Sequence, residues 1–297
     1  MDMLRTFSMM NAVRLMVLGT VWAGAATGVH AEETKSVGTA SFCCIYQHKV
    51  KTVDLNQQAV TDSTAAMLEV GDNVAKYGDW AAYHGQLPAN YDTKNLAGNP
   101  WTKDYVTVYQ DYPQQGKLTV REGLLPHFYV YEEEPKLVWT PVEGTDTVLG
   151  HVCSKAVTTY GGRTWTASYA ADIPMVYGPW KLTGLPGLIL KAESADGIHS
   201  FVAQVLYDID AQAMAWDGTE KDVKVARNKF VTLRNRLKTD KQWPKSASYY
   251  VNAEDIRSVV IVKDHNHEGL TPNMSINGIS LPMSGGTGHF FQPLETK

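Results

Sequence analysis

Short stretches in which apolar and polar residues alternate dominate the chain between residues 40 and 207. Successive side chains of a strand point to opposite faces of a sheet, so this alternation predicts strands. Turn-forming residues, such as the pair Gly161-Gly162, separate the stretches as they do in β-hairpins. The pattern therefore predicts an antiparallel succession of strands over residues 40–53, 65–70, 105–112, 117–122, 128–131, 136–142, 147–160, 163–170, 187–194 and 198–207.

A helix is predicted over residues 219–237, where the period of the apolar positions changes. Apolar residues there recur at spacings of three and four, which places them on one helix face. They are Val223, Ala226, Phe230, Leu233 and Leu237. The opposite face is basic and carries Lys224, Arg227, Lys229, Arg234 and Arg236. We interpret it as the solvated face of a helix that covers the sheet, and a helix at a membrane surface is the alternative.

Together these elements predict an α+β fold that is mainly antiparallel β. We expect one large curved sheet or half-barrel with the amphipathic helix packed on it. This arrangement is similar to that of LolA-like lipoprotein carriers, by analogy of fold alone. Residues 253–263 fit either a helix or a strand, and residues 264–297 are predicted to be rich in loops.

The first 31 residues have the pattern of a secretory signal peptide. Arg5 and Arg14 supply positive charge, and residues 15–26 form an apolar run. This run is too short to span a bilayer, which takes about 20 residues. We expect a signal peptide over residues 1–31 and a single mature domain over residues 32–297, exported to the periplasm or the outer membrane. No cysteine directly follows the apolar run, so no lipid anchor is expected at the N-terminus.

The charge balance is slightly acidic, with 27 Lys and Arg against 31 Asp and Glu and a net charge of −4. Removal of residues 1–31 would take away two positive charges and one negative charge, which leaves −5. Such a chain has no basic field, and we expect no nucleic-acid partner. An apolar content of 44% is enough for a sizeable core.

Three cysteines allow one disulfide, which an exported chain would retain. Cys43 and Cys44 are neighbours in a predicted strand and face opposite ways, so only one of them can point at Cys153. A Cys44–Cys153 bridge is preferred because Cys44 shares a face with Phe42 and Tyr46. A Cys43–Cys153 bridge and three free thiols are the alternatives.

The string Gly184-Leu185-Pro186-Gly187-Leu188-Ile189 resembles the motif after which the GLPGLI family is named. Three more segments are similar to the family's pattern, namely residues 150–156 (Gly-His-Val-Cys-Ser-Lys-Ala), 162–165 (Gly-Arg-Thr-Trp) and 178–182 (Gly-Pro-Trp-Lys-Leu). The finish Phe291-Gln292-Pro293-Leu294-Glu295 is similar to the family's Asn-Pro-Ile-Glu-Leu. The family consists of exported proteins of Gram-negative bacteria without an established activity. The resemblance therefore implies export and a β-rich fold, and it provides no catalytic residues.

Glycine and proline between two predicted strands give this motif a structural interpretation. Proline removes a backbone donor and fixes φ, and glycine permits positive φ, so the string forms a rigid corner. The residues expected to shape it are Pro174, Gly178, Pro179, Gly184, Pro186 and Gly187. We expect the apolar positions that follow, Leu188, Leu190 and Ala192, to point into the core.

Sequence motifs of catalysis and of cofactor binding are absent. The chain has no Gly-x-Ser-x-Gly, no His-Glu-x-x-His and no glycine-rich phosphate loop, so we assign no catalytic residues and no cofactor. Acidic residues gather at Glu132-Glu133-Glu134 and at Asp208 and Asp210, and we interpret both groups as exposed. A hydrolase whose site assembles from scattered residues is one alternative function.

A second alternative is a periplasmic protein that binds copper or zinc. His265 and His267 stand in a polar loop and are the candidate metal ligands. Residues nearby have the ligand types of exported copper and zinc sites, and they are Glu268, Met274, Met283 and His289. The spacing is loose, and two exposed histidines are the simpler interpretation.

The leading functional hypothesis rests on four aromatic residues. Trp165, Tyr169, Tyr177 and Trp180 would line an apolar groove if the helix covers the sheet only in part. With no catalytic motif in the chain, we expect a non-enzymatic exported binding or accessory protein. Its ligand would be apolar, namely a lipid, an acyl chain or a hydrophobic peptide.

Overall fold

The structure is a computed structural model that describes residues 35–54, 56–79, 105–124, 126–238, 259–262, 273–276, 279–282 and 290–297. The chain divides into two units, Met1–Glu33 and Thr34–Lys297, and every described residue lies in the second. The signal peptide predicted for residues 1–31 lies outside the described residues. Within the described part, no helix is both long and apolar enough to cross a membrane.

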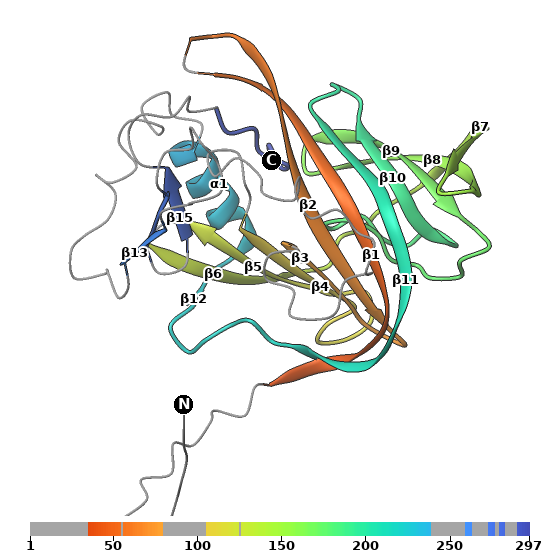
Figure 1. The fold of residues 1–297 in the computed structure, drawn as a ribbon, viewed down its shortest axis with the longest axis horizontal. Helices are drawn as coiled ribbons and strands as arrows, with labels where there is room; N and C mark the ends of the chain where they lie inside the picture. The colour runs from red at the N-terminus through yellow and green to blue at the C-terminus, as the bar shows by residue number, and fades with distance from the viewer. Residues whose placement is uncertain are drawn as a thin grey trace, which may run out of the picture. The chain divides into compact units, whose positions relative to one another are not determined.

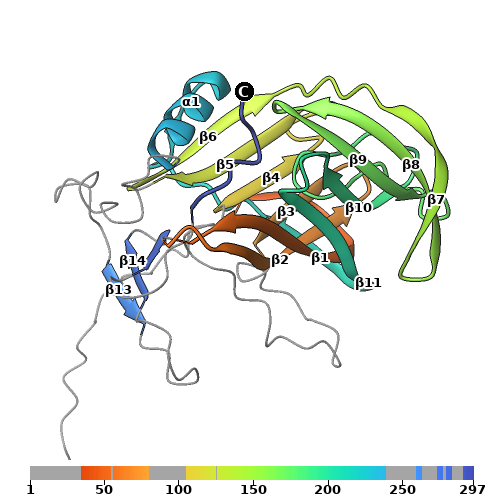
Figure 2. The same cartoon turned by 90° about the horizontal axis from the view of Figure 1, so that it is seen from above.

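Twelve strands form one large curved sheet in the order β12-β6-β5-β4-β3-β2-β1-β11-β10-β9-β8-β7 (Figures 1 and 2). Its strands are β1 (Ser36–Val53), β2 (Ala59–Gly71), β3 (Ala75–Asp79), β4 (Val106–Gln110), β5 (Leu118–Leu124), β6 (His127–Glu133), β7 (Thr140–Val148), β8 (His151–Tyr160), β9 (Arg163–Ala170), β10 (Leu188–Ser194), β11 (His199–Ala215) and β12 (Val223–Lys224). Neighbours pair antiparallel except for β12, which runs parallel to β6. The prediction of a mainly antiparallel curved sheet is confirmed.

Two meanders meet at the middle of this sheet. Strands β1 to β6 follow one another outward on one side, and β11 to β7 follow one another on the other side. The two halves join where β1 pairs with β11 from Ser36↔Ala215 to Val50↔His199. The chain therefore passes from one edge to the opposite edge between β6 and β7, and residues far apart in sequence become neighbours on β1 and β11.

One face of the sheet carries the main apolar core. Alternate residues of many of its strands point into it, as the period of a strand requires. Leu188, Leu190 and Ala192 of β10 are buried there, as the sequence predicts. Trp165 of β9 and Phe201 of β11 belong to the same core, with ring centroids 6.1 Å apart.

The one described helix, α1 (Arg227–Lys238), packs on the sheet through Phe230, whose ring lies 5.1 Å from Tyr129 and 5.5 Å from Tyr131 of β6. It begins eight residues later than the predicted start at Thr219. The preceding residues form a turn and then pair with β6, where the Val225 amide donates to the Val130 carbonyl at 3.1 Å. Backbone groups used in the edge of the sheet are not available for a helix.

Two further predictions need correction. Strand β3 lies in a segment to which the sequence pattern assigns no strand. A second sheet of three antiparallel strands, β13 (Val259–Val262), β14 (Asn273–Ile276) and β15 (Ile279–Pro282), lies largely in the segment predicted to be loop-rich. Its strands have four residues each, which is too short for an alternation pattern to be recognised.

Candidate functional site

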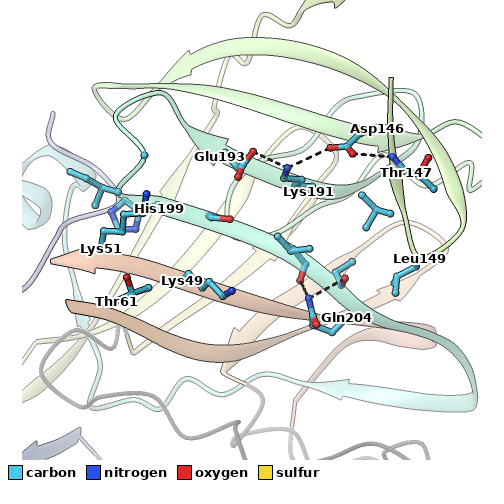
Figure 3. Close-up of a pocket in the computed structure, with 16 residues that line it drawn as sticks. Lys49, Lys51, Thr61, Asp146, Thr147, Leu149, Lys191, Glu193, His199 and Gln204 are labelled. Atoms are coloured by element: carbon cyan, nitrogen blue, oxygen red, sulfur yellow. Dashed lines mark hydrogen bonds and ion pairs between the residues drawn. The ribbon is translucent and has the colours of Figure 1, made fainter. Parts of the chain in front are cut away.

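A groove of about 660 Å³ opens on the sheet face opposite to the main core (Figure 3). It crosses β2, β1, β11 and β10, and the turn between β7 and β8 forms its far wall. Alternation along β1 explains why lysines reach it. His48 and Val50 point into the core, so Lys49 and Lys51 point out of the opposite face.

Three lysines give the groove its charge. Lys49 and Lys51 lie about 7 Å apart along β1, because residues two apart in a strand share a face. Lys191 of β10 lies across β11 from them. Its ammonium is paired with Glu193 at 2.9 Å and with Asp146 at 3.5 Å. Lys49 and Lys51 have no ion-pair partner among the described residues.

The two carboxylates of the groove wall, Asp146 and Glu193, both pair with Lys191. Asp146 accepts a hydrogen bond from the Thr147 amide at 2.9 Å. Partial burial acts to raise the pKa of the Asp146 carboxyl, but this hydrogen bond and the Lys191 charge together lower it. Hydrogen bonding to Glu193 is the main cause that raises the pKa of Lys191. Asp146 and Lys191 are therefore charged at neutral pH. The groove lining holds three lysines and two carboxylates, so its formal charge is positive.

The groove is lined by polar and apolar side chains, and no hydroxyl among its described lining residues is hydrogen-bonded to a base. Ser200 lies beside Lys49 in register, and Thr61 lies beside Lys51. His199 also borders the groove, but its two ring nitrogens lie 3.2 Å from His48 Nε2 and 3.3 Å from the Pro293 carbonyl oxygen. Burial lowers the pKa of His199 to about 3, so it is neutral. The arrangement can bind an anion through charge and hydrogen bonds.

The four aromatic residues predicted to line an apolar groove are mostly core residues. Trp165, Tyr177 and Trp180 are buried, and Tyr169 is half-buried. The Trp165 and Trp180 rings lie 5.7 Å apart and fill the space beside Phe201. Tyr177 also borders a second hollow of about 700 Å³. These aromatic side chains thus pack mainly against other residues of the protein.

The glycine and proline motif forms the connection between β9 and β10. Pro179 and Gly187 are buried there, while Pro174, Gly184 and Pro186 are exposed. The carbonyls of Gly178 and Trp180 both accept hydrogen bonds from the buried Gln110 amide, at 2.7 and 2.9 Å. These contacts fit the structural role expected of the motif.

Gly187 is the position in this motif with least room. A Cβ atom there would lie 2.3 Å from the Ala170 carbonyl oxygen, which is a backbone atom that cannot move aside. We expect Gly187→Ala to lower the free energy of unfolding by about 1–3 kcal/mol. Gly78→Ala, whose Cβ would meet nothing closer than 3.7 Å, serves as the control and should be neutral in chemical denaturation. Equal stability of the two variants would contradict this role.

The predicted Cys44–Cys153 disulfide is wrong, because all three cysteines are free and buried. Cys44 lies on β1 and Cys153 on β8, with β11, β10 and β9 between them. Strands spaced about 4.8 Å apart put the two residues roughly 19 Å apart across the sheet. Burial also raises the pKa of the Cys44 thiol, so this side chain behaves as an unreactive apolar group.

The candidate metal ligands His265 and His267 lie outside the described residues. Among the residues that are described, no group of three or more His, Cys, Asp or Glu side chains could hold a metal ion.

Charged residues meet inside the protein, and they include Glu133 and Arg227, which the sequence pattern predicted to be exposed. Lys181, from the motif before β10, and Glu295, near the C-terminus, are fully buried and in contact. Lys181 Nζ also lies 2.5 Å from Glu133 Oε1. Arg227 binds the same two carboxylates, at 2.9 Å for Glu133 and 2.6 Å for Glu295. Glu133 is thus half-buried rather than exposed, with 9% of its side chain accessible to solvent, because opposite charges compensate it.

A second ion pair and two tyrosines complete this cluster. Arg234 Nη1 lies 2.8 Å from Glu122 Oε1, and both side chains are buried, so the basic helix face is not wholly solvated. Tyr160 donates to Glu133 Oε2 at 2.6 Å. Burial, followed by the nearby carboxylates, raises the pKa of Tyr131 and Tyr160. We call the six charged residues the charge cluster; they are Glu122, Glu133, Lys181, Arg227, Arg234 and Glu295.

Comparison with known proteins gives weak structural matches. No family model and no curated protein matches the chain. Two structures of PNGF-II, in space groups P21 and C2, align with TM-scores of 0.43 and 0.42, both at 12% identity. Each alignment covers 79% of this chain, and 38% and 36% of those chains. This chain therefore spans less than two-fifths of their length.

Proposed function

We propose that the chain is an exported cell-envelope protein of the GLPGLI family that binds an anionic ligand on the groove of β1, β2, β10 and β11 without catalysing a reaction. Export rests on the signal-peptide pattern of residues 1–31, and family membership on the motif that includes residues 184–189. The ligand class rests on the groove itself. It is a compact molecule that carries phosphate or sulfate groups.

The pair Lys49 and Lys51, for which the described residues provide no ion-pair partner, is the observation that carries this proposal. Two like charges on one strand face repel each other, and an ion pair would normally relieve the repulsion. Here the nearby carboxylates Asp146 and Glu193 are paired with Lys191 instead. An anion in the groove would gain from both lysines and from the hydroxyls of Thr61 and Ser200 beside them.

The ligand class differs from the apolar one expected from the sequence. The four aromatic residues that would have bound an apolar ligand pack mainly in the core. The space between α1 and the sheet also holds the charge cluster, which a lipid chain would have to displace at the cost of buried, unpaired charges. The groove on the opposite face is open and polar, which favours a charged ligand.

Titration with sucrose octasulfate, a compact polyanion, tests the proposal by isothermal calorimetry. We expect the double variant Lys49→Ala/Lys51→Ala to bind about 10- to 100-fold more weakly than the wild type, because each charged hydrogen bond contributes about 1 kcal/mol or more. Affinity should also fall as salt rises from 50 to about 300 mM, since exposed charges are screened.

The control is Lys224→Ala, which removes an exposed lysine far along the sheet on β12. This variant should bind like the wild type. If the wild type does not bind, or if Lys224→Ala weakens binding as much as the double variant does, the groove has no specific role and the proposal fails.

A further inference from the structure

The C-terminal residues 290–297 lie against the core side of the sheet without forming a strand of it. Figures 1 and 2 show this segment, in dark blue, passing beside α1. Its backbone bonds to the rest of the protein at few points. The Phe290 amide donates to the Val53 carbonyl at 3.0 Å, and the Thr296 amide donates to the Gly161 carbonyl at 2.7 Å.

Side chains from several elements hold the carbonyls of this segment. Arg163 of β9 donates from Nη2 to the Pro293 carbonyl at 2.7 Å. Asn235 and Arg234 of α1 donate to the Glu295 carbonyl at 2.8 and 3.1 Å. Hydrogen bonds to the backbone of an extended segment are one of the ways in which proteins bind peptides.

Apolar side chains of the segment lie in the core, and its buried carboxylate lies beside cationic side chains. Phe291 and Leu294 are buried in the core. The Glu295 carboxylate is fully buried and binds both Lys181 and Arg227. The segment therefore has the two features of a bound peptide, namely apolar anchors and one charged anchor with its own counter-ions.

The charge cluster is balanced only when the segment is in place. With Glu295, three carboxylates face three cationic side chains. Without it, Glu122 and Glu133 would remain with Lys181, Arg227 and Arg234, which leaves one positive charge of the cluster uncompensated. The protein surface in contact with this segment therefore favours an extended peptide that carries one carboxylate preceded by apolar residues.

We propose that the surface bound by the C-terminal segment 290–297 is a peptide-recognition site, which this segment occupies in its own chain and which accepts the same segment from a second copy of this chain. A second copy carries the identical apolar and acidic side chains, so exchange makes no new kind of contact. The covalent link gives the chain's own segment an effective concentration of about millimolar, which keeps the exchange rare in the wild type. This inference is independent of the anion groove.

The experiment uses the full chain with Glu295→Gln, which keeps the shape of the side chain and removes its charge. The probe is a fluorescent peptide with the sequence of residues 290–297, Phe-Phe-Gln-Pro-Leu-Glu-Thr-Lys. The matched control peptide has Gln in place of its Glu. Fluorescence anisotropy is measured for both peptides with the wild-type chain and with the Glu295→Gln chain.

We expect the Glu295→Gln chain to bind the Glu peptide at least tenfold more tightly than the Gln peptide, and the wild-type chain to bind both weakly. If Glu295→Gln does not fold alone, the Glu peptide should restore its thermal transition and the Gln peptide should not. Equal binding of the two peptides, or no binding and no restoration by either, overturns the proposal.

Discussion

Replacing Lys181 with alanine is expected to lower the free energy of unfolding by about 3–5 kcal/mol, the usual cost of removing one partner of a buried ion pair. Lys181 is fully buried and contacts both Glu133 and Glu295. Its loss leaves two carboxylates to share the remaining cations in a site closed to water. Guanidinium denaturation at pH 7 measures the change.

Two further variants separate charge from packing. Lys181→Met/Glu295→Leu removes one charge of each sign and keeps the rest of the charge cluster balanced, so it should be less destabilising than Lys181→Ala. Lys117→Ala breaks an ion pair with the exposed Glu134 at 3.8 Å and should cost less than about 1 kcal/mol. A loss under about 1 kcal/mol for Lys181→Ala would show that the cluster does not stabilise the fold.

Acidification below pH 6.5 is expected to destabilise the protein steeply through one histidine pair. His48 Nε2 lies 3.2 Å from His199 Nδ1, and His48 stacks on Phe201 with ring centroids 4.2 Å apart. Burial is the main cause that lowers the pKa of both histidines, to about 3 for His199, and the nearby Arg163 charge lowers that of His199 further. Both rings are neutral in the folded protein, whereas both would be protonated in the unfolded chain below about pH 6.5.

The sign of the effect follows from proton counts. Below pH 6.5 the unfolded chain binds more protons than the folded protein, so the free energy of unfolding decreases as the pH is lowered. Above pH 6.5 these two groups do not change the stability. Each histidine then raises the unfolding equilibrium constant by up to about tenfold per pH unit, or about 100-fold for the pair. Carboxylates add to the trend below about pH 5, so the window from pH 6.5 to 5 is the informative one.

Chemical denaturation across this window checks the effect. His48→Phe keeps an aromatic ring beside Phe201 and removes one titrating group, so the slope should fall to about tenfold per pH unit. His151→Asn, a change at a half-exposed histidine bonded to Asp172, should keep the full slope. If the wild type has the same stability at pH 5.2 and 6.5, the pair does not control the acid limb.

Local patterns in the sequence predict much of the sheet. Strand β9 has the predicted bounds, residues 163–170, because its alternation is strong and the hairpin loop Gly161-Gly162 precedes it. Both glycines have the positive φ expected of such a loop, 62° and 81°. The pairing of β1 with β11 could not be predicted, because residues about 170 positions apart leave no local signal of being neighbours.

The polar contacts in the interior could not be predicted from the sequence pattern either. Arg234 and Glu133 look like solvated residues when each is taken alone, and only the fold brings Glu122, Lys181 and Glu295 to them. The groove could not be predicted from the sequence for a similar reason. Lys49 and Lys51 are ordinary outward residues of a strand until β10 and the β7–β8 turn place Lys191 and its carboxylates beside them.

Lysine acetylation footprinting tests the central claim, anion binding in the groove, most directly. Full-length protein is treated with an acetylating reagent with and without saturating sucrose octasulfate, and modification of each lysine is followed by mass spectrometry. The bound anion should slow acetylation of Lys49 and Lys51 by at least about fivefold and leave the exposed Lys224 unchanged, because direct ion pairing protects an amine. Equal rates at Lys49 and Lys51 with and without the anion, or protection of Lys224 to the same degree, would contradict it.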